Sequence, residues 1–228
     1  MKNLLKLLPF FFVFVGCDEE KTEALDGTVF SESYIQVFVI TDDVKFEYEK
    51  ETEAIKVSFE GEEIANHAQT TNYGRPAQDL FNDFCNKFGD TGYNRNVVRF
   101  TYWAVVDEFS IEVTCNEDFN GIPAGASLNE ITGLIGTSAY GYVKSKYVDV
   151  FNWEDAQMFD KYTLLGRHQG FHPVKKLLSE LEPSDMTLLN NFAYLKFNEI
   201  PSSGEYVFTI NFSSKDKEIS KDISIKFE

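Results

Sequence analysis

The stretch Glu205–Phe212, EYVFTINF, decides the fold class of this chain. Tyr206, Phe208, Ile210 and Phe212 occupy every second position of it. A period of two is typical of a strand that buries one face and exposes the other. This stretch therefore predicts a half-buried β-strand, and the search for its partners starts on either side of it.

Two further strands flank this one along the chain. Residues 193–197 and 219–227 are rich in aromatic and β-branched residues, and polar turns lie at 201–204 and 213–216. The three segments predict a C-terminal antiparallel meander. Such a meander is similar to the last strands of an immunoglobulin-like sandwich, so the resemblance implies two packed antiparallel sheets.

The N-terminal half repeats the β-pattern. An apolar run around residues 34–40 ends at the polar triplet 41–43, which predicts a break in the strand. Residues 44–48 and 55–59 then alternate with period two on either side of a charged turn at 49–53. They predict a β-hairpin. Strands are also expected at 97–106 and 109–115, followed by a polar loop at 116–129.

The clearest helix is expected from Pro76 to Phe88. Proline suits the first helical position, and Gly89 suits the C-terminal cap. The apolar residues recur at the spacing of one helix face. This face consists of Ala77, Leu80, Phe81, Phe84, Cys85 and Phe88.

Two shorter helices are expected in the second half, one capped by Asn152 over 153–162 and one opened by Pro173. Val174, Leu177, Leu178 and Leu181 form the apolar face of the second. The whole pattern predicts a mainly β, α+β fold with two or three short helices. We expect a single globular domain over 33–228, with a subdivision near 145–190 left open.

The first 16 residues have the features of a signal peptide. Lys2 and Lys6 supply positive charge, and an apolar run ends at Val15. The run is too short for a membrane-spanning helix, which needs about 20 apolar residues. The alternative is a buried apolar strand that ends in a cysteine.

The residues around Cys17 point to the cell envelope. Phe14-Val15-Gly16-Cys17 resembles the lipobox of bacterial lipoproteins, which implies cleavage before Cys17 and lipid on its thiol and new amino group. Asp18-Glu19-Glu20 looks like the export signal of Bacteroidota lipoproteins, which implies display on the outer face of the outer membrane. The alternative is a plain acidic tether over 17–32 at the periplasmic face. Residues 109–129 also resemble a segment of uncharacterised Bacteroidota lipoproteins, which implies no activity.

Composition limits the partners. The 228 residues carry a formal charge of −16, which disfavours nucleic acid and anionic membrane surfaces, so the membrane contact is expected through the lipid alone. The hydrophobic content of 43% suffices for a core, and the aromatic content of 15% favours β-structure.

Cys85 and Cys115 remain once Cys17 is assigned to lipid. In an oxidising compartment they are candidates for a disulfide, and two buried free thiols are the alternative. Their spacing matches no zinc site.

No catalytic residue, metal ligand or cofactor motif emerges. Residues 116–121 begin like a calcium loop, but Ser127 stands where a glutamate is needed and Pro123 interrupts the loop. His168 and His172 lie four apart among glycines that disfavour a helix. Residues 136–141 lack the spacing of a nucleophile turn.

Aromatic clusters are the remaining functional feature. Residues 102–103, 140–142 and 151–153 could stack on sugar rings, although aromatic residues in β-proteins more often lie in the core. The leading hypothesis is a non-catalytic module for glycan binding, for adhesion or for an outer-membrane protein assembly. The alternative is a hydrolase with an unrecognised carboxylate or metal site.

Overall fold

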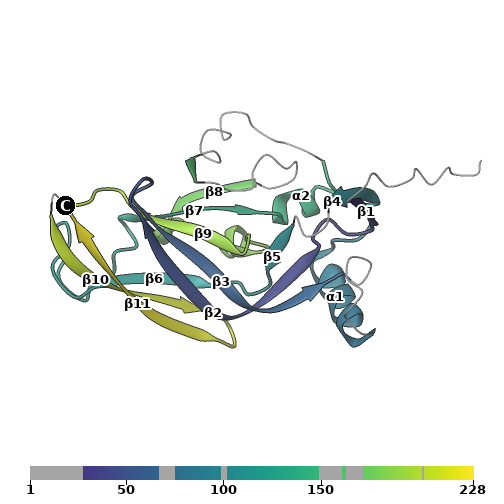
Figure 1. Cartoon of the computed structure of the whole chain (residues 1–228), viewed down its shortest axis with the longest axis horizontal. Helices are drawn as coiled ribbons and strands as arrows, with labels where there is room; N and C mark the ends of the chain where they lie inside the picture. The colour runs from purple at the N-terminus through teal and green to yellow at the C-terminus, as the bar shows by residue number, and fades with distance from the viewer. Residues whose placement is uncertain (1–27, 67–74, 99–101, 149–160, 163–171, 202) are drawn as a thin grey trace, which may run out of the picture.

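The computed structural model describes residues 28–66, 75–98, 102–148, 161–162, 172–201 and 203–228 (Figure 1). The predicted mainly β fold with few short helices is confirmed. The strands are Thr28–Ser31 (β1), Val37–Glu49 (β2), Ala54–Ala65 (β3), Arg95–Val98 (β4), Trp103–Val105 (β5), Ser110–Cys115 (β6), Thr132–Ser138 (β7), His172–Leu177 (β8), Phe192–Phe197 (β9), Gly204–Ser213 (β10) and Glu218–Phe227 (β11). The helices are Arg75–Phe88 (α1), Tyr140–Lys144 (α2), the 3-10 turn Leu178–Glu180 (η3) and Pro183–Met186 (α4).

Three sheets are formed in the described residues. The largest has the strand order β5-β2-β3-β9-β7-β8, the second has the order β11-β10-β6, and β1 pairs with β4. All strand pairs among the described residues are antiparallel except β2 with β5, which is parallel. The predicted antiparallel sheets are confirmed, with this one parallel pair. The predicted C-terminal meander is wrong at its first strand: β10 pairs with β11, but β9 lies in the larger sheet between β3 and β7, because those two strands supply its hydrogen-bond partners.

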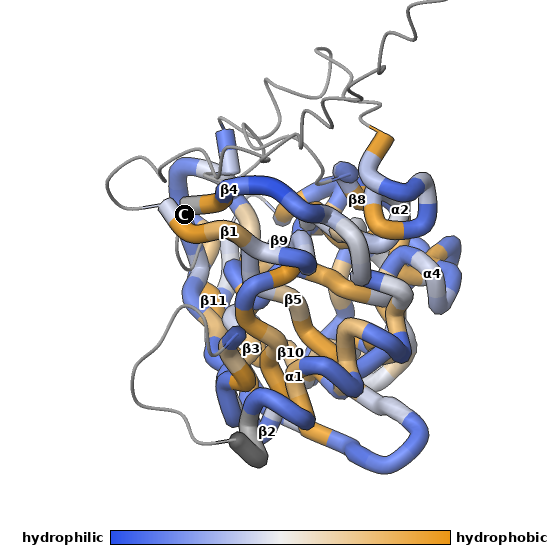
Figure 2. The backbone as a smooth tube through the Cα atoms, turned by 90° about the vertical axis from the view of Figure 1, so that its right-hand side faces the viewer, coloured by the Kyte–Doolittle hydropathy of each residue, from blue (hydrophilic) through white to orange (hydrophobic). Residues whose placement is uncertain are grey.

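The six-stranded and three-stranded sheets enclose a shared core. Phe208, Ile210 and Phe212 of β10 are fully buried, as their period of two predicts, and they pack with apolar residues of β3. The ring of Phe59 lies edge-on to that of Phe212 at 5.7 Å. Apolar segments run through the interior and hydrophilic ones lie around it (Figure 2).

The strand order agrees with the immunoglobulin-like prediction. When β2, β3, β6, β7, β9, β10 and β11 are lettered A to G in chain order, the spatial orders β2-β3-β9-β7 and β6-β10-β11 become ABED and CFG. These are the strand orders of the two sheets in such sandwiches. β5 and β8 are added at the two edges of the larger sheet. The immunoglobulin-like assignment itself stays a prediction.

β2 does not end at 41–43, where a break was expected. It continues past a β-bulge between Thr41 and Asp43. The predicted hairpin of residues 44–48 and 55–59 is confirmed, and the pairing with β3 also extends beyond the bulge. Gly61 faces the bulge, and a Cβ there would overlap the carbonyl oxygen of Ile40. The absence of a side chain at Gly61 therefore permits the close approach of the two strands.

α1 covers a second core at one end of the molecule, where β1, β4 and α2 also lie (Figure 1). Phe81, Cys85 and Phe88 are buried, and the ring of Phe38 on β2 lies 5.3 Å from that of Phe81. Gly89 follows the helix with a φ of 75°. The predicted helix and its C-terminal glycine are confirmed.

The prediction of a helix that begins at Pro173 is wrong. Residues 172–177 form β8, an edge strand that pairs with β7. An edge strand tolerates proline because the missing N–H need not face a neighbour. Val174 and Leu178 are buried in the core between the sheets, and a short apolar spacing cannot distinguish this arrangement from a helix face.

Two strand boundaries also differ from expectation. The single strand expected over 97–106 is wrong, because β4, which ends at Val98, pairs with β1, whereas β5, which begins at Trp103, pairs with β2. Residues 28–31, assigned to the tether, form β1, and Ser31 is buried. The signal peptide, Cys17, Asp18-Glu19-Glu20 and most of the helix expected at 153–162 lie outside the described residues.

The structure decides between the disulfide and the two free thiols that the sequence left open. Cys85 and Cys115 are both free and buried. Cys85 belongs to the core under α1, whereas Cys115 ends β6 in the core between the two sheets. Their separation into different cores explains why no bridge forms, and the alternative of two buried thiols is confirmed.

Candidate functional site: a pocket between β1 and α1

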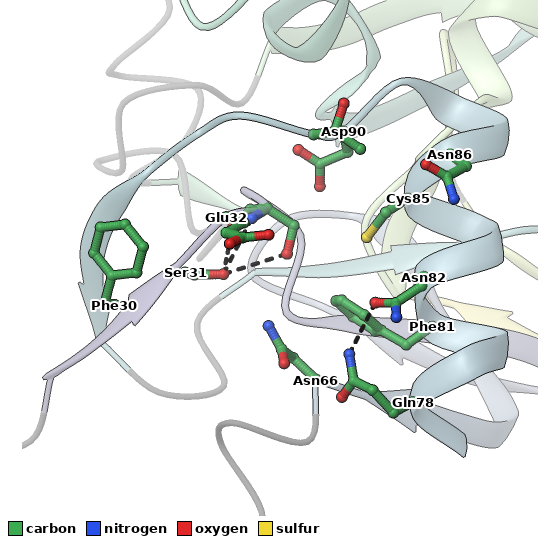
Figure 3. A pocket seen from close by; sticks show the side chains of 12 residues that line it. Phe30, Ser31, Glu32, Asn66, Gln78, Phe81, Asn82, Cys85, Asn86 and Asp90 are labelled. Carbon is green, nitrogen blue, oxygen red and sulfur yellow. Dashed lines mark hydrogen bonds between the residues drawn. The ribbon is translucent and has the colours of Figure 1, made fainter. Parts of the chain in front are cut away.

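A pocket of about 490 Å³ lies between β1 and α1 (Figure 3). Phe30 and Ser31 come from β1, and the opposite wall comes from one side of α1. Asn66, which follows β3, points toward the same space. Segments that are distant in sequence therefore contribute to one concave surface.

The helical wall is a row of amide side chains. Gln78, Asn82 and Asn86 recur every four residues, so they share one side of α1. The amide nitrogen of Gln78 donates to Oδ1 of Asn82 at 2.9 Å. Each amide offers both donors and an acceptor, which suits a ligand rich in hydroxyl groups.

The base of the pocket is apolar and its rim carries an exposed ring. Phe81 and Cys85 are buried beneath the amide row, whereas Phe30 is 57% exposed. Burial raises the pKa of the Cys85 thiol, so this cysteine is protonated at neutral pH and is no activated nucleophile. Glu32 and Thr91 complete the polar rim.

Asp90 anchors the inner end of the pocket. Its carboxylate is fully buried and accepts hydrogen bonds from the backbone N–H groups of Tyr34 at 2.9 Å and Ile35 at 2.8 Å. The hydroxyl of Tyr147 donates to it at 3.0 Å. Burial raises the pKa of Asp90, and these donors oppose the rise. The carboxylate thus joins the end of α1 to the chain that follows β1.

Of the described aromatic residues proposed as sugar platforms, one is buried and three are half-buried. Tyr142 is buried, and the ring of Tyr102 lies 4.2 Å from that of the buried Tyr34. Burial raises the pKa of Tyr102 to about 12. Trp103 and Tyr140 are half-buried, and residues 151–153 lie outside the described residues. Tyr142 is therefore a core residue, and Tyr102 packs against the same core.

The calcium-like loop uses its polar side chains for structural hydrogen bonds. Oδ1 of Asn116 accepts from the backbone of Val207 at 2.9 Å, and Oδ1 of Asp118 accepts from that of Ala124 at 2.9 Å. The Asn120 amide donates to a backbone carbonyl at 2.7 Å. These contacts are those of a polar turn after a strand.

The other candidate residues that the structure describes belong to strands of the larger sheet. Ser138 is buried at the end of β7 and donates to the carbonyl of Thr187 at 2.7 Å. His172 begins β8, and His168 lies outside the described residues. Within the described ranges, no three His, Cys, Asp or Glu side chains are grouped as metal ligands.

Comparisons of the chain with protein-family models, with curated proteins and with solved structures find no match. Among the described residues, no helix has the length and apolar character needed to cross a membrane.

Sequence reasoning missed this pocket, although part of its signal was present. The four-residue spacing of Gln78, Asn82 and Asn86 marks an amide stripe beside the apolar face of α1. Phe30 and Asn66 carried no comparable signal, because only the pairing of β1 with β4 and the end of β3 bring them to the helix.

Proposed function

We propose that this protein is a lipid-anchored, non-catalytic binding module on the outer-membrane surface, and that it binds a neutral glycan between β1 and α1. The location rests on the lipobox-like sequence ending at Cys17 and on the acidic residues 18–20. The binding site rests on the chemistry of the pocket.

The observation that carries the proposal is that the amide row of α1 and the exposed ring of Phe30 line the same pocket. Sugar hydroxyls can donate hydrogen bonds to side-chain amides and accept hydrogen bonds from them, and the apolar face of a sugar ring packs on an aromatic face. Glu32 at the rim and the charge of −16 disfavour an acidic sugar at this pocket. A neutral saccharide therefore fits best.

Binding is tested by screening neutral oligosaccharides and titrating each hit by calorimetry. We expect Phe30→Ala and Asn82→Ala each to weaken affinity about 2–10-fold, as loss of about 0.5–1.5 kcal/mol implies. Ser224→Ala, a change of an exposed polar side chain on β11, is the control and should leave affinity unchanged. Equal affinity in all three variants would refute this site.

Surface display is tested by protease shaving of intact cells. The protein with its natural Asp18-Glu19-Glu20 should be digested, and a variant with three alanines there should be protected. A periplasmic control protein must stay intact in both strains. Protection of the natural protein would overturn display at the surface and point to the periplasmic face.

A further inference from the structure

We propose that a second pocket, bordered by lysines on the larger sheet, binds an oxyanion carried by a compact organic molecule. This pocket of about 670 Å³ lies over β7, β8 and β9 and is separate from the pocket at α1. Four lysines contribute to its lining: Lys161, Lys175, Lys176 and Lys196. Lys176 stands opposite Leu134, so its side chain leaves β8 from the other face of the sheet and its contribution here is through the backbone.

Strand register explains how the lysines meet. Lys175 of β8 stands opposite Ile135 of β7, and Lys196 of β9 stands opposite Gly133 of β7. Opposed residues of an antiparallel pair share a face, and positions two apart return to it. Lys175 and Lys196 therefore lie on one face on either side of the central strand β7.

Gly133 leaves space between these two lysines. A Cβ at this position would meet only backbone oxygens of Lys176 and Lys196, at 3.6 and 3.7 Å. No side chain rises from the central strand at this point, so the surface is hollowed beside the ammonium groups. A ligand can approach the backbone there.

Two of the lysines are held in place by the protein. Nζ of Lys176 lies 2.8 Å from Oδ2 of Asp185, and Nζ of Lys196 donates to the carbonyl of Thr52 at 2.8 Å and lies 3.6 Å from Glu53. These contacts orient the ammonium groups and partly neutralise them.

The other two lysines keep their charge available. Lys175 and Lys161 are exposed, and no carboxylate of the described residues lies within 4.0 Å of either ammonium group. Glu180 is the one carboxylate among the described residues that line the pocket. The result is a local excess of positive charge in a chain of net charge −16, which attracts an anion.

The size and lining define the ligand class. The volume exceeds what an inorganic ion fills, and Ile135 and Leu177 add apolar surface. Lysine binds carboxylate and phosphate as a point charge, without the bidentate geometry of arginine. A sugar-sized molecule with one carboxylate or phosphate group fits these features.

The experiment is calorimetric titration at low salt with galacturonate, glucose 6-phosphate and uncharged glucose. We expect galacturonate, glucose 6-phosphate or both to bind, glucose not to bind, and affinity to fall as salt rises. Binding of galacturonate alone would identify a carboxylate ligand, and binding of glucose 6-phosphate alone a phosphate ligand.

Variants of Lys175 test the site itself. Lys175→Glu should weaken binding at least about tenfold, whereas Lys175→Arg should retain it. Lys215→Glu, in the exposed turn after β10, makes the same change in net charge elsewhere. Equal loss in Lys175→Glu and Lys215→Glu, or binding of no anion, would overturn the proposal. Asn82→Ala should have no effect here, so failure of the glycan pocket is distinguishable.

Discussion

Replacement of Asp90 by alanine should destabilise the end of the molecule that carries the pocket between β1 and α1. The carboxylate is fully buried and satisfies the N–H groups of Tyr34 and Ile35, both of which are themselves fully buried. Its removal leaves two backbone donors without an acceptor, at about 1–3 kcal/mol each. Part of this loss in stability is offset, because the variant no longer has the free-energy cost of burying a carboxylate. We expect the free energy of unfolding to fall by about 3 kcal/mol.

Urea denaturation at pH 7, followed by fluorescence and circular dichroism, measures this change. Asp90→Asn retains the shape and one acceptor oxygen, so its loss should be smaller, at about 1–2 kcal/mol. An Asp90→Ala loss below about 1 kcal/mol at an unchanged m-value would refute the inference that this carboxylate anchors the segment.

The pH dependence supplies a second readout. Burial raises the pKa of Asp90 above its ordinary value of about 3.9, so the unfolded state releases this proton at lower pH than the folded state. The stabilisation from this group is therefore complete below the ordinary pKa and falls as pH rises toward the raised one. The difference in stability between the natural protein and Asp90→Asn should shrink across that window. A difference that grows with pH would contradict the direction of the shift.

Three further predictions follow from packing. Cys85 and Cys115 are buried with raised pKa values, so a thiol reagent should label both only after unfolding; labelling in the native state would contradict their burial. Gly61→Ala should lower the melting temperature markedly because its Cβ overlaps the facing strand, whereas Gly133→Ala should change it little; equal effects would refute the close approach. Phe119→Ala removes a fully buried ring and should cost about 3–5 kcal/mol in urea titrations, and a loss under 1 kcal/mol would count against this core.

Sequence patterns correctly predicted those elements in which the apolar residues recur with the period of a strand or of a helix. β10 follows the alternation of Phe208, Ile210 and Phe212, and α1 follows the apolar face that includes Phe81 and Cys85. In these segments, side-chain periodicity and burial agree, so no distant contact is needed to choose between helix and strand.

Elsewhere distant contacts decided the outcome. The spacing around Val174 fits a short helix, but pairing with β7 makes this segment an edge strand. The polar triplet 41–43 reads as a break, but pairing with β3 across Gly61 makes it a bulge. Long-range hydrogen bonds and burial outweigh local propensities that differ by less than about 1 kcal/mol per residue.

The sequence by itself determined the acidic charge, the alternating strand β10 with its neighbour β11, and the helix of residues 76–88, and its N-terminus resembles that of lipoproteins. Only the tertiary structure brought Phe30 and the amide row of α1 to one pocket, put Lys175 and Lys196 on one face, and separated Cys85 from Cys115. The physical reason is that these arrangements depend on strand pairing and register between segments far apart in the chain. Such pairings leave no periodic signal at the residues that they bring together.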